Sequence, residues 1–128
     1  MTVASAVSAL PQRILGKTGE KVPMLGLGTA PGGFGLEDAA AIELIEMAID
    51  SGVTYLDTAP GYERAHAQLG HVVPRRRDEI FLVTKVLTSD GKEAIEKLEE
   101  SLRVLQTDAV DVCYVHSLGH LDVDQLLA

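Results

Sequence analysis

Four side chains that can transfer a proton or stabilise a charge occupy comparable positions in this sequence. They are Asp57, Tyr62, Lys85 and His116. Three of them end an apolar run, and the tyrosine follows the first of these runs by a short loop. The run ends lie 28 and 31 residues apart, which is the spacing of consecutive βα units. Because parallel strands end at one edge of their sheet, we expect the four side chains to meet at one site.

A phenol, an ammonium, a carboxylate and an imidazole form a coherent set for proton transfer. A free tyrosine, with a pKa of about 10, is a poor acid at neutral pH. A nearby ammonium favours the phenolate and brings the phenol into working range. The carboxylate keeps the ammonium charged and aimed, and the imidazole can hydrogen-bond a developing oxyanion. This set predicts general acid catalysis at an oxygen atom.

Each residue taken alone also fits an ordinary structural role. Asp57 suits a loop cap before Thr58, and Tyr62 suits a half-buried loop aromatic. Lys85 suits a solvated strand end, and His116 suits a structural histidine with satisfied hydrogen bonds. Only the joint occurrence of the four, in this order, favours the catalytic hypothesis.

A metal site is the other chemistry that the histidines suggest. His116 and His120 are four residues apart, and His66, His71 and Asp57 are also present. That spacing places two ligands on one face of a helix, but Gly119 and the strand predicted before it argue against a continuous helix there. We therefore predict no metal.

Sequence patterns predict alternating strands and helices. The predicted elements are a hairpin over residues 12–24, strands at 25–28, 53–56, 80–84 and 109–115, helices at 36–51, 64–72 and 90–105, and the start of a helix at 121–128. Residues 29–35 are predicted to form a flexible loop. Pro74 is expected to end the second helix, and Arg75–Arg77 to lie in a solvated loop.

The third helix has the clearest signals. Asp90 and Glu93 have the spacing of a capping box. Its predicted buried face consists of Ala94, Ile95, Leu98, Leu102 and Leu105.

Regular βα alternation predicts a parallel α/β fold. A dinucleotide-binding Rossmann motif is excluded, because Gly26 and Gly28 lack a third glycine at the required spacing and a glycine-rich stretch follows them. The glycines at 32, 33 and 35 are not followed by the Lys-Ser or Lys-Thr of a phosphate-binding loop.

The composition of the chain argues against some classes of function. The chain has 128 residues, of which 46% are hydrophobic, which predicts one globular domain. A net charge of −8 argues against nucleic-acid binding, and no apolar run approaches the roughly 20 residues that span a bilayer. Cys113 is the only cysteine, so we expect a reducing, cytoplasmic location. Residues 1–11 are predicted to be a flexible N-terminus.

At these residues the sequence resembles the N-terminal half of the aldo-keto reductase family. The matching segments are Gly26-Leu-Gly-Thr29, Asp57-Thr-Ala-x-x-Tyr62, Leu69-Gly70, Arg77-Asp-Glu-Ile-Phe-Leu-Val-Thr-Lys85, Glu99-x-Ser-Leu102, Leu105-x-Thr-Asp108 and the strand that ends at His116. Where the family usually has glycine after the catalytic tyrosine and an acidic residue three positions further on, this chain has Glu63 and His66.

The resemblance implies a (β/α)8 barrel of the TIM type that reduces aldehydes and ketones with a nicotinamide cofactor. It implies NADPH (NADP) as the cofactor, with NADH as the alternative, and a small carbonyl compound as the substrate. It further implies Tyr62 as proton donor, Lys85 and Asp57 as its tuning pair, and His116 as the group that orients the carbonyl. Gly28 and Thr29 correspond to the loop that approaches the cofactor.

A complete barrel needs about 250 residues, so residues 12–128 are expected to form only the first four βα units with the N-terminal hairpin. Four parallel strands leave two open edges, which favours self-association. The alternative to an active reductase is therefore a half barrel without turnover that binds a partner or another copy of itself.

Overall fold

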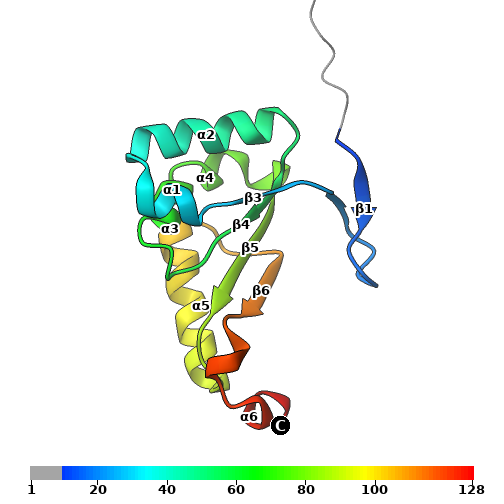
Figure 1. Ribbon diagram of the computed structural model, residues 1–128, viewed down its shortest axis with the longest axis vertical. Coiled ribbons are helices and arrows are strands. Elements are labelled where there is room, and N and C mark those ends of the chain that lie inside the picture. Colours follow the sequence, from blue (N-terminus) through cyan, green and yellow to red (C-terminus); the bar gives the residue numbers. More distant parts are fainter. Residues whose placement is uncertain (1–9) are drawn as a thin grey trace, which may run out of the picture.

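The computed structural model describes residues 10–128 (Figure 1). A hairpin of β1 (Gln12–Ile14) and β2 (Lys21–Pro23) lies apart from the main body. Its strands pair antiparallel, with Gln12 opposite Pro23, and the turn closes through the Leu15 N–H, which donates to the Glu20 carbonyl at 2.9 Å. The predicted hairpin is thus confirmed. The flexible N-terminus predicted for residues 1–11 falls almost entirely outside the described residues and stays a prediction.

Within residues 10–128 the main sheet has four parallel strands in chain order. They are β3 (Gly26–Gly28), β4 (Tyr55–Asp57), β5 (Phe81–Val86) and β6 (Val112–Val115). The pairing aligns Gly28 with Asp57, and Lys85 with Tyr114. The predicted parallel α/β fold is confirmed, as the first four βα units of a barrel.

Helices cover one face of this sheet, and in Figure 1 they lie to the left of it and across the top. The main ones are α2 (Asp38–Asp50), α3 (Ala65–Gly70) and α5 (Gly91–Leu105). The core between the two layers includes the fully buried Leu56, Leu69, Leu82 and Leu105. Since side chains alternate along a strand, the residues next to these leucines point to the opposite face.

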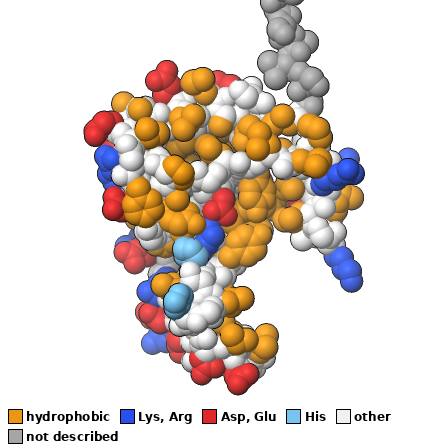
Figure 2. Space-filling view, viewed as in Figure 1, with side chains coloured by type: hydrophobic (Ala, Val, Ile, Leu, Met, Phe, Trp, Pro, Cys, Tyr) orange, Lys and Arg blue, Asp and Glu red, His pale blue; other side chains and the backbone are white. Residues whose placement is uncertain are grey.

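That opposite face is rich in aromatic residues and partly open to solvent. Tyr55 stacks on Phe81 with ring centroids 5.2 Å apart, and its hydroxyl lies 3.5 Å from that of Tyr114, which is 43% exposed. Burial, and then the Tyr114 hydroxyl, raise the pKa of Tyr55. Figure 2 shows hydrophobic side chains gathered over the sheet, with acidic, basic and histidine side chains meeting at one end of the patch.

The loop predicted for residues 29–35 is wrong, because the short helix α1 (Ala30–Gly35) occupies it. Pro31 stands in the first turn, where its missing N–H removes no helical hydrogen bond. The turn ends with the Leu36 N–H donating to the Gly32 carbonyl at 3.1 Å. Gly33 lies directly against the Tyr62 carbonyl, where a Cβ atom would clash. Contact with a distant loop therefore supports a helix that glycine and proline alone disfavour.

Pro74 begins a helix instead of ending one. The helix α3 stops at Gly70, and Pro74 stands in the first turn of α4 (Val73–Arg76), which the 3-10 turn η1 (Arg77–Glu79) follows. Arg75–Arg77 therefore do not form the predicted solvated loop. Their ion-pair distances are 2.6 Å for Arg75–Glu46, 2.7 Å for both Arg76–Asp50 and Arg76–Glu79, and 2.9 Å for Arg77–Asp111. The cluster ties α2 and the start of β6 to the end of α4.

The start of α5 confirms half of the predicted capping box. The Glu93 N–H donates to Asp90 Oδ1 at 2.8 Å, but the Glu93 carboxylate accepts from the Thr88 hydroxyl instead of the Asp90 N–H. The Asp90 N–H donates to Thr88 Oγ1 at 3.1 Å. The hydrogen bond from the Thr88 hydroxyl, and then the one from Lys97, lower the pKa of Glu93.

The predicted buried face of α5 is only partly correct. Leu105 is fully buried, whereas Ile95 is 62% exposed, because no described element covers the start of the helix on that side. After β6 the chain forms η2 (Leu118–His120) and α6 (Val123–Leu127). The final stub of helix was predicted from residue 121 and begins two residues later.

Candidate active site

Asp57 and Lys85 form an ion pair across neighbouring strands. Asp57 is paired with Val83 in the β4–β5 register, so Lys85 lies two residues further along, on the same face. Lys85 Nζ donates to Asp57 Oδ1 at 2.5 Å and to the Thr58 carbonyl at 3.0 Å. The lysine side chain is 13% exposed and the aspartate side chain 32%. The sheet register therefore holds the ammonium in a fixed, partly buried place.

Tyr62 lies in the tight loop between β4 and α3. Its N–H donates to the Ala59 carbonyl at 3.1 Å, and its carbonyl accepts from the Ala65 N–H at 3.0 Å. Glu63 next to it has a positive φ of 46°. Lys85 Nζ lies 5.0 Å from the centroid of the Tyr62 ring, within reach of a cation–π contact. The loop thus brings the phenol and the ammonium together.

His116 follows β6 and completes the group. Its N–H donates to the Val86 carbonyl at 2.8 Å, which extends the pairing of β5 with β6 by one residue. The imidazole meets the Tyr62 ring edge-on, with centroids 5.8 Å apart and an interplanar angle of 87°. The four residues predicted to share a site therefore lie together.

Gly28 and Thr29 stand beside this group at the end of β3. Gly28 is exposed, and a Cβ atom there would meet nothing within 4 Å. The Thr29 hydroxyl is buried and donates to the Asp57 carbonyl at 3.0 Å, parallel to the Thr29 N–H, which donates to the same atom at 2.9 Å. Thr29 therefore anchors the Asp57 backbone, and the open approach at this end of the sheet is over the Gly28 backbone.

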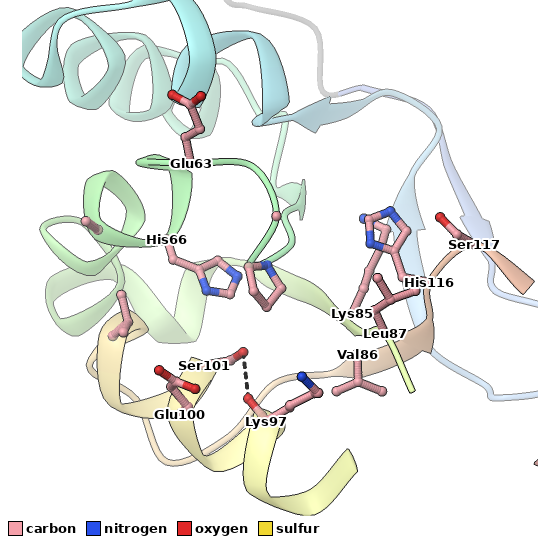
Figure 3. A pocket seen from close by; sticks show the side chains of 14 residues that line it. Glu63, His66, Lys85, Val86, Leu87, Lys97, Glu100, Ser101, His116 and Ser117 are labelled. Carbon is pink, nitrogen blue, oxygen red and sulfur yellow. Dashed lines mark hydrogen bonds between the residues drawn. The ribbon is translucent and has the colours of Figure 1, made fainter. Parts of the chain in front are cut away.

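A cavity of about 590 Å³ borders the site. It lies between the loop after β4, α3, α5 and the ends of β5 and β6, and both Lys85 and His116 line it. Figure 3 shows His66 pointing into it from α3, with Ser101, Lys97 and Glu100 on the wall formed by α5.

Sequence reasoning gave His66 no role at this site beyond noting its unusual residue type. Its side chain is buried, and Nε2 lies 3.1 Å from the Thr84 hydroxyl. Burial, and then the positive charge of Lys85, lower the pKa of His66 to about 4, so the ring is neutral at pH 7. One signal in the sequence could have identified His66. It stands four residues after Tyr62, on the helix predicted between that tyrosine and the strand that ends on Lys85.

The histidines do not converge on a metal site. Among residues 10–128, no three His, Cys, Asp or Glu side chains lie close enough together to hold an ion. In the same range, no helix is both long and apolar enough to cross a membrane.

The known proteins to which this chain is similar in sequence and fold are aldo-keto reductases. A family model described as "Aldo/keto reductase family" matches residues 24–123. The chain is 33% identical to the aldo-keto reductase YhdN of Bacillus subtilis, over 77% of this chain and 35% of that protein.

Solved structures agree with the sequence match. A Pseudomonas aeruginosa protein assigned to the aldo-keto reductases superposes with a TM-score of 0.81 at 32% identity, over 96% of this chain and 53% of its own. An aldo-keto reductase of Klebsiella pneumoniae in complex with NADPH superposes with a TM-score of 0.74 at 32% identity, over 85% of this chain and 40% of its own. The chain thus spans about a third of the curated relative and about half of the first of these structures.

Proposed function

The chain belongs to the aldo/keto reductase family, and we propose that it forms the proton-transfer part of an enzyme that reduces aldehydes and ketones to alcohols. The observation that carries this proposal is the convergence of a phenol, an ammonium and an imidazole around one point. Lys85 Nζ lies 5.0 Å from the Tyr62 ring centroid, and the His116 ring centroid lies 5.8 Å from the same ring.

Each residue has one task in this proposal. The Tyr62 hydroxyl gives its proton to the alkoxide oxygen that develops as the carbonyl is reduced. The Lys85 ammonium stabilises the phenolate that remains, and the Asp57 carboxylate fixes the direction of that ammonium. His116 donates a hydrogen bond to the substrate oxygen and so orients the carbonyl. The substrate is a small carbonyl compound.

We propose NADPH as the cofactor, with NADH as the alternative. The structure of the Klebsiella pneumoniae relative is in complex with NADPH. When bound, NADPH supplies the hydride, which no protein side chain can donate. The open space over the Gly28 backbone fits the approach of a flat cofactor group. Lys85, His116 and the two residues that flank Tyr62 line a cavity beside the Tyr62 loop. Gly28 and Thr29 are the residues proposed to face it.

The first experiment is NADPH binding to the purified 128-residue chain, measured by isothermal titration calorimetry, with NADH as the comparison. Saturable binding, followed by oxidation of NADPH that depends on a simple aldehyde, supports the proposal. An absence of binding at millimolar concentrations of both cofactors contradicts activity of this chain by itself. Residues 12–128 would then act as one half of a barrel, which is how we interpret their domain role.

A second candidate function is a half barrel without turnover that associates with another copy of the chain. The observation in its favour is the partly open aromatic face formed by Tyr55, Phe81 and Tyr114. It is flanked by β3 and β6, whose outer edges pair with no other strand within residues 10–128. Sedimentation equilibrium separates the two outcomes. A dimer that Tyr114→Lys disrupts supports association through this face, and a monomer at all concentrations contradicts it.

A further inference from the structure

One buried hydrogen bond links the helix that follows the Tyr62 loop to the strand that ends on Lys85. His66 belongs to α3 and is 6% exposed, and Thr84 belongs to β5 and is fully buried. Their side chains meet at 3.1 Å, from His66 Nε2 to Thr84 Oγ1. Polar groups this deeply buried are costly to leave unpaired, so the contact is a strong constraint on both elements.

Both ends of this bond lie close along the chain to residues of the proposed proton-transfer group. Thr84 immediately precedes Lys85 in β5. On the other side, α3 begins at Ala65, whose N–H donates to the Tyr62 carbonyl at 3.0 Å. The His66–Thr84 bond therefore closes a short path from the Tyr62 backbone to the Lys85 backbone.

The groups around His66 favour a neutral side chain at this position. Lys85 is close enough to contribute to the lowered pKa of the imidazole, and a cation at position 66 would repel that ammonium. The other titratable groups on the same cavity are Glu63, Lys97, Glu100 and His116. A neutral hydrogen-bonding group fits between them without adding charge next to the Asp57–Lys85 pair.

We propose that His66 is a positioning residue: through Thr84 it fixes the end of β5 against α3 and so holds Lys85 Nζ between the Asp57 carboxylate and the Tyr62 ring. The inference rests on the proposed role of Lys85 in proton transfer. A purely structural role predicts that only stability depends on the hydrogen bond, whereas a positioning role predicts that the environment of Lys85 depends on it even where stability is unchanged.

The test compares four variants of the 128-residue chain: His66→Leu, Thr84→Val, the double variant, and His66→Gln. The amide nitrogen of glutamine reaches about as far as Nε2 and keeps a neutral hydrogen bond. In the double variant neither partner is left unpaired, so the folded state is retained with little loss of stability. The readout is the rate at which an amine-acylating reagent modifies Lys85, measured by mass spectrometry at a temperature well below the melting midpoint. The rate is expressed relative to Lys92, whose side chain is 88% exposed.

We expect the ratio of Lys85 to Lys92 modification to rise about three- to tenfold in the double variant, the range that corresponds to one lost hydrogen bond. The His66→Gln variant should stay close to the original ratio. An unchanged ratio in a double variant that still melts as the original chain does would overturn the proposal, as would an increase in His66→Gln equal to that in His66→Leu. The modification rate can be measured without cofactor or turnover, so a failure of the proposed reductase activity leaves this test intact.

Discussion

Lys85 Nζ and Asp57 Oδ1 lie 2.5 Å apart, and this contact joins the ends of two adjacent parallel strands. The ammonium also donates to the Thr58 carbonyl at 3.0 Å. A charge removed this far from water is stable only when its hydrogen bonds are made. The pair therefore fixes the direction of the ammonium toward the Tyr62 loop, and most of the proposed chemistry depends on it.

Tyr62→Phe should abolish most of the carbonyl reduction, because it removes the hydroxyl of the ring whose centroid lies 5.0 Å from Lys85 Nζ. The expected decrease in kcat/KM is about 100-fold or more, the contribution of a positioned general acid. The measurement is aldehyde-dependent NADPH oxidation by a preparation that binds the cofactor. Tyr114→Phe is the matched control, since Tyr114 stands opposite Lys85 on β6 but its hydroxyl lies beside that of Tyr55, at 3.5 Å. Equal activities of the two variants would contradict the assignment.

Asp57→Asn should destabilise the fold by about 1–3 kcal/mol, because it weakens a charge-assisted hydrogen bond to a lysine that stays partly buried. The free energy of unfolding follows from urea denaturation monitored by circular dichroism. Lys92→Met serves as the control, because its partner Glu96 lies 4.0 Å away at an exposed site. We expect a change below about 0.5 kcal/mol there. Comparable losses in both variants would show that burial of the Asp57–Lys85 pair is unimportant.

Acidification should destabilise the chain through His66. Its pKa is about 4 in the folded state and near 6.5 when unfolded, so the unfolded state binds more protons between these values. Stability is therefore fully present above pH 6.5 and is lost as the pH falls toward 4, by about 2–3 kcal/mol. Urea midpoints measured across this range test the prediction.

The matched control for the pH prediction is His66→Gln, which cannot gain a proton. Glu79 and Glu93 have lowered pKa values, through Arg76 and Thr88 respectively. At lower pH their protonation reduces stability by the same amount in the original chain and in His66→Gln. Only the difference between the two pH profiles reports on His66. Parallel profiles between pH 6.5 and 4 would show that the imidazole is not held neutral by burial.

Arg77→Gln should cost more stability than Arg75→Gln. Arg77 donates to the Ala109 carbonyl at 3.1 Å, to the Ile80 carbonyl at 3.0 Å and to Asp111 at 2.9 Å, with a side chain that is 24% exposed. We expect a loss of about 2 kcal/mol for Arg77, from several hydrogen bonds to partly buried groups. For Arg75, whose side chain is 58% exposed, we expect at most about 1 kcal/mol. Thermal melts of the two variants decide the order.

Gly33→Ala should disturb the Tyr62 loop, because the added methyl group would overlap the Tyr62 carbonyl and crowd Ala65. The expected loss of stability is about 1–3 kcal/mol, as for overpacking in a rigid contact. Gly35→Ala, in the same helix, meets nothing within 4 Å and should be neutral or slightly stabilising. Calorimetric melting of both variants provides the comparison. A tolerated alanine at position 33 would mean that α1 and the loop move apart easily.

The sequence by itself determined the order of the strands and the four side chains at their ends. Apolar runs that end on Asp57, Lys85 and His116 carry enough local information to predict parallel strands. The spacing of βα units places the carboxyl ends of these strands at the same edge of the sheet. The capping of α5 by Asp90 was an equally local signal.

Only the tertiary structure decided the features that depend on contacts between distant segments. The glycine-rich stretch forms α1 because Gly33 packs against the Tyr62 loop, and no propensity of residues 29–35 contains that contact. Arg75–Arg77 become an anchor because α2 and the start of β6 bring acidic partners to them. His66 meets Thr84 because α3 lies over β5. In each case the stabilising partner is far away in sequence, so its free energy is absent from any local pattern.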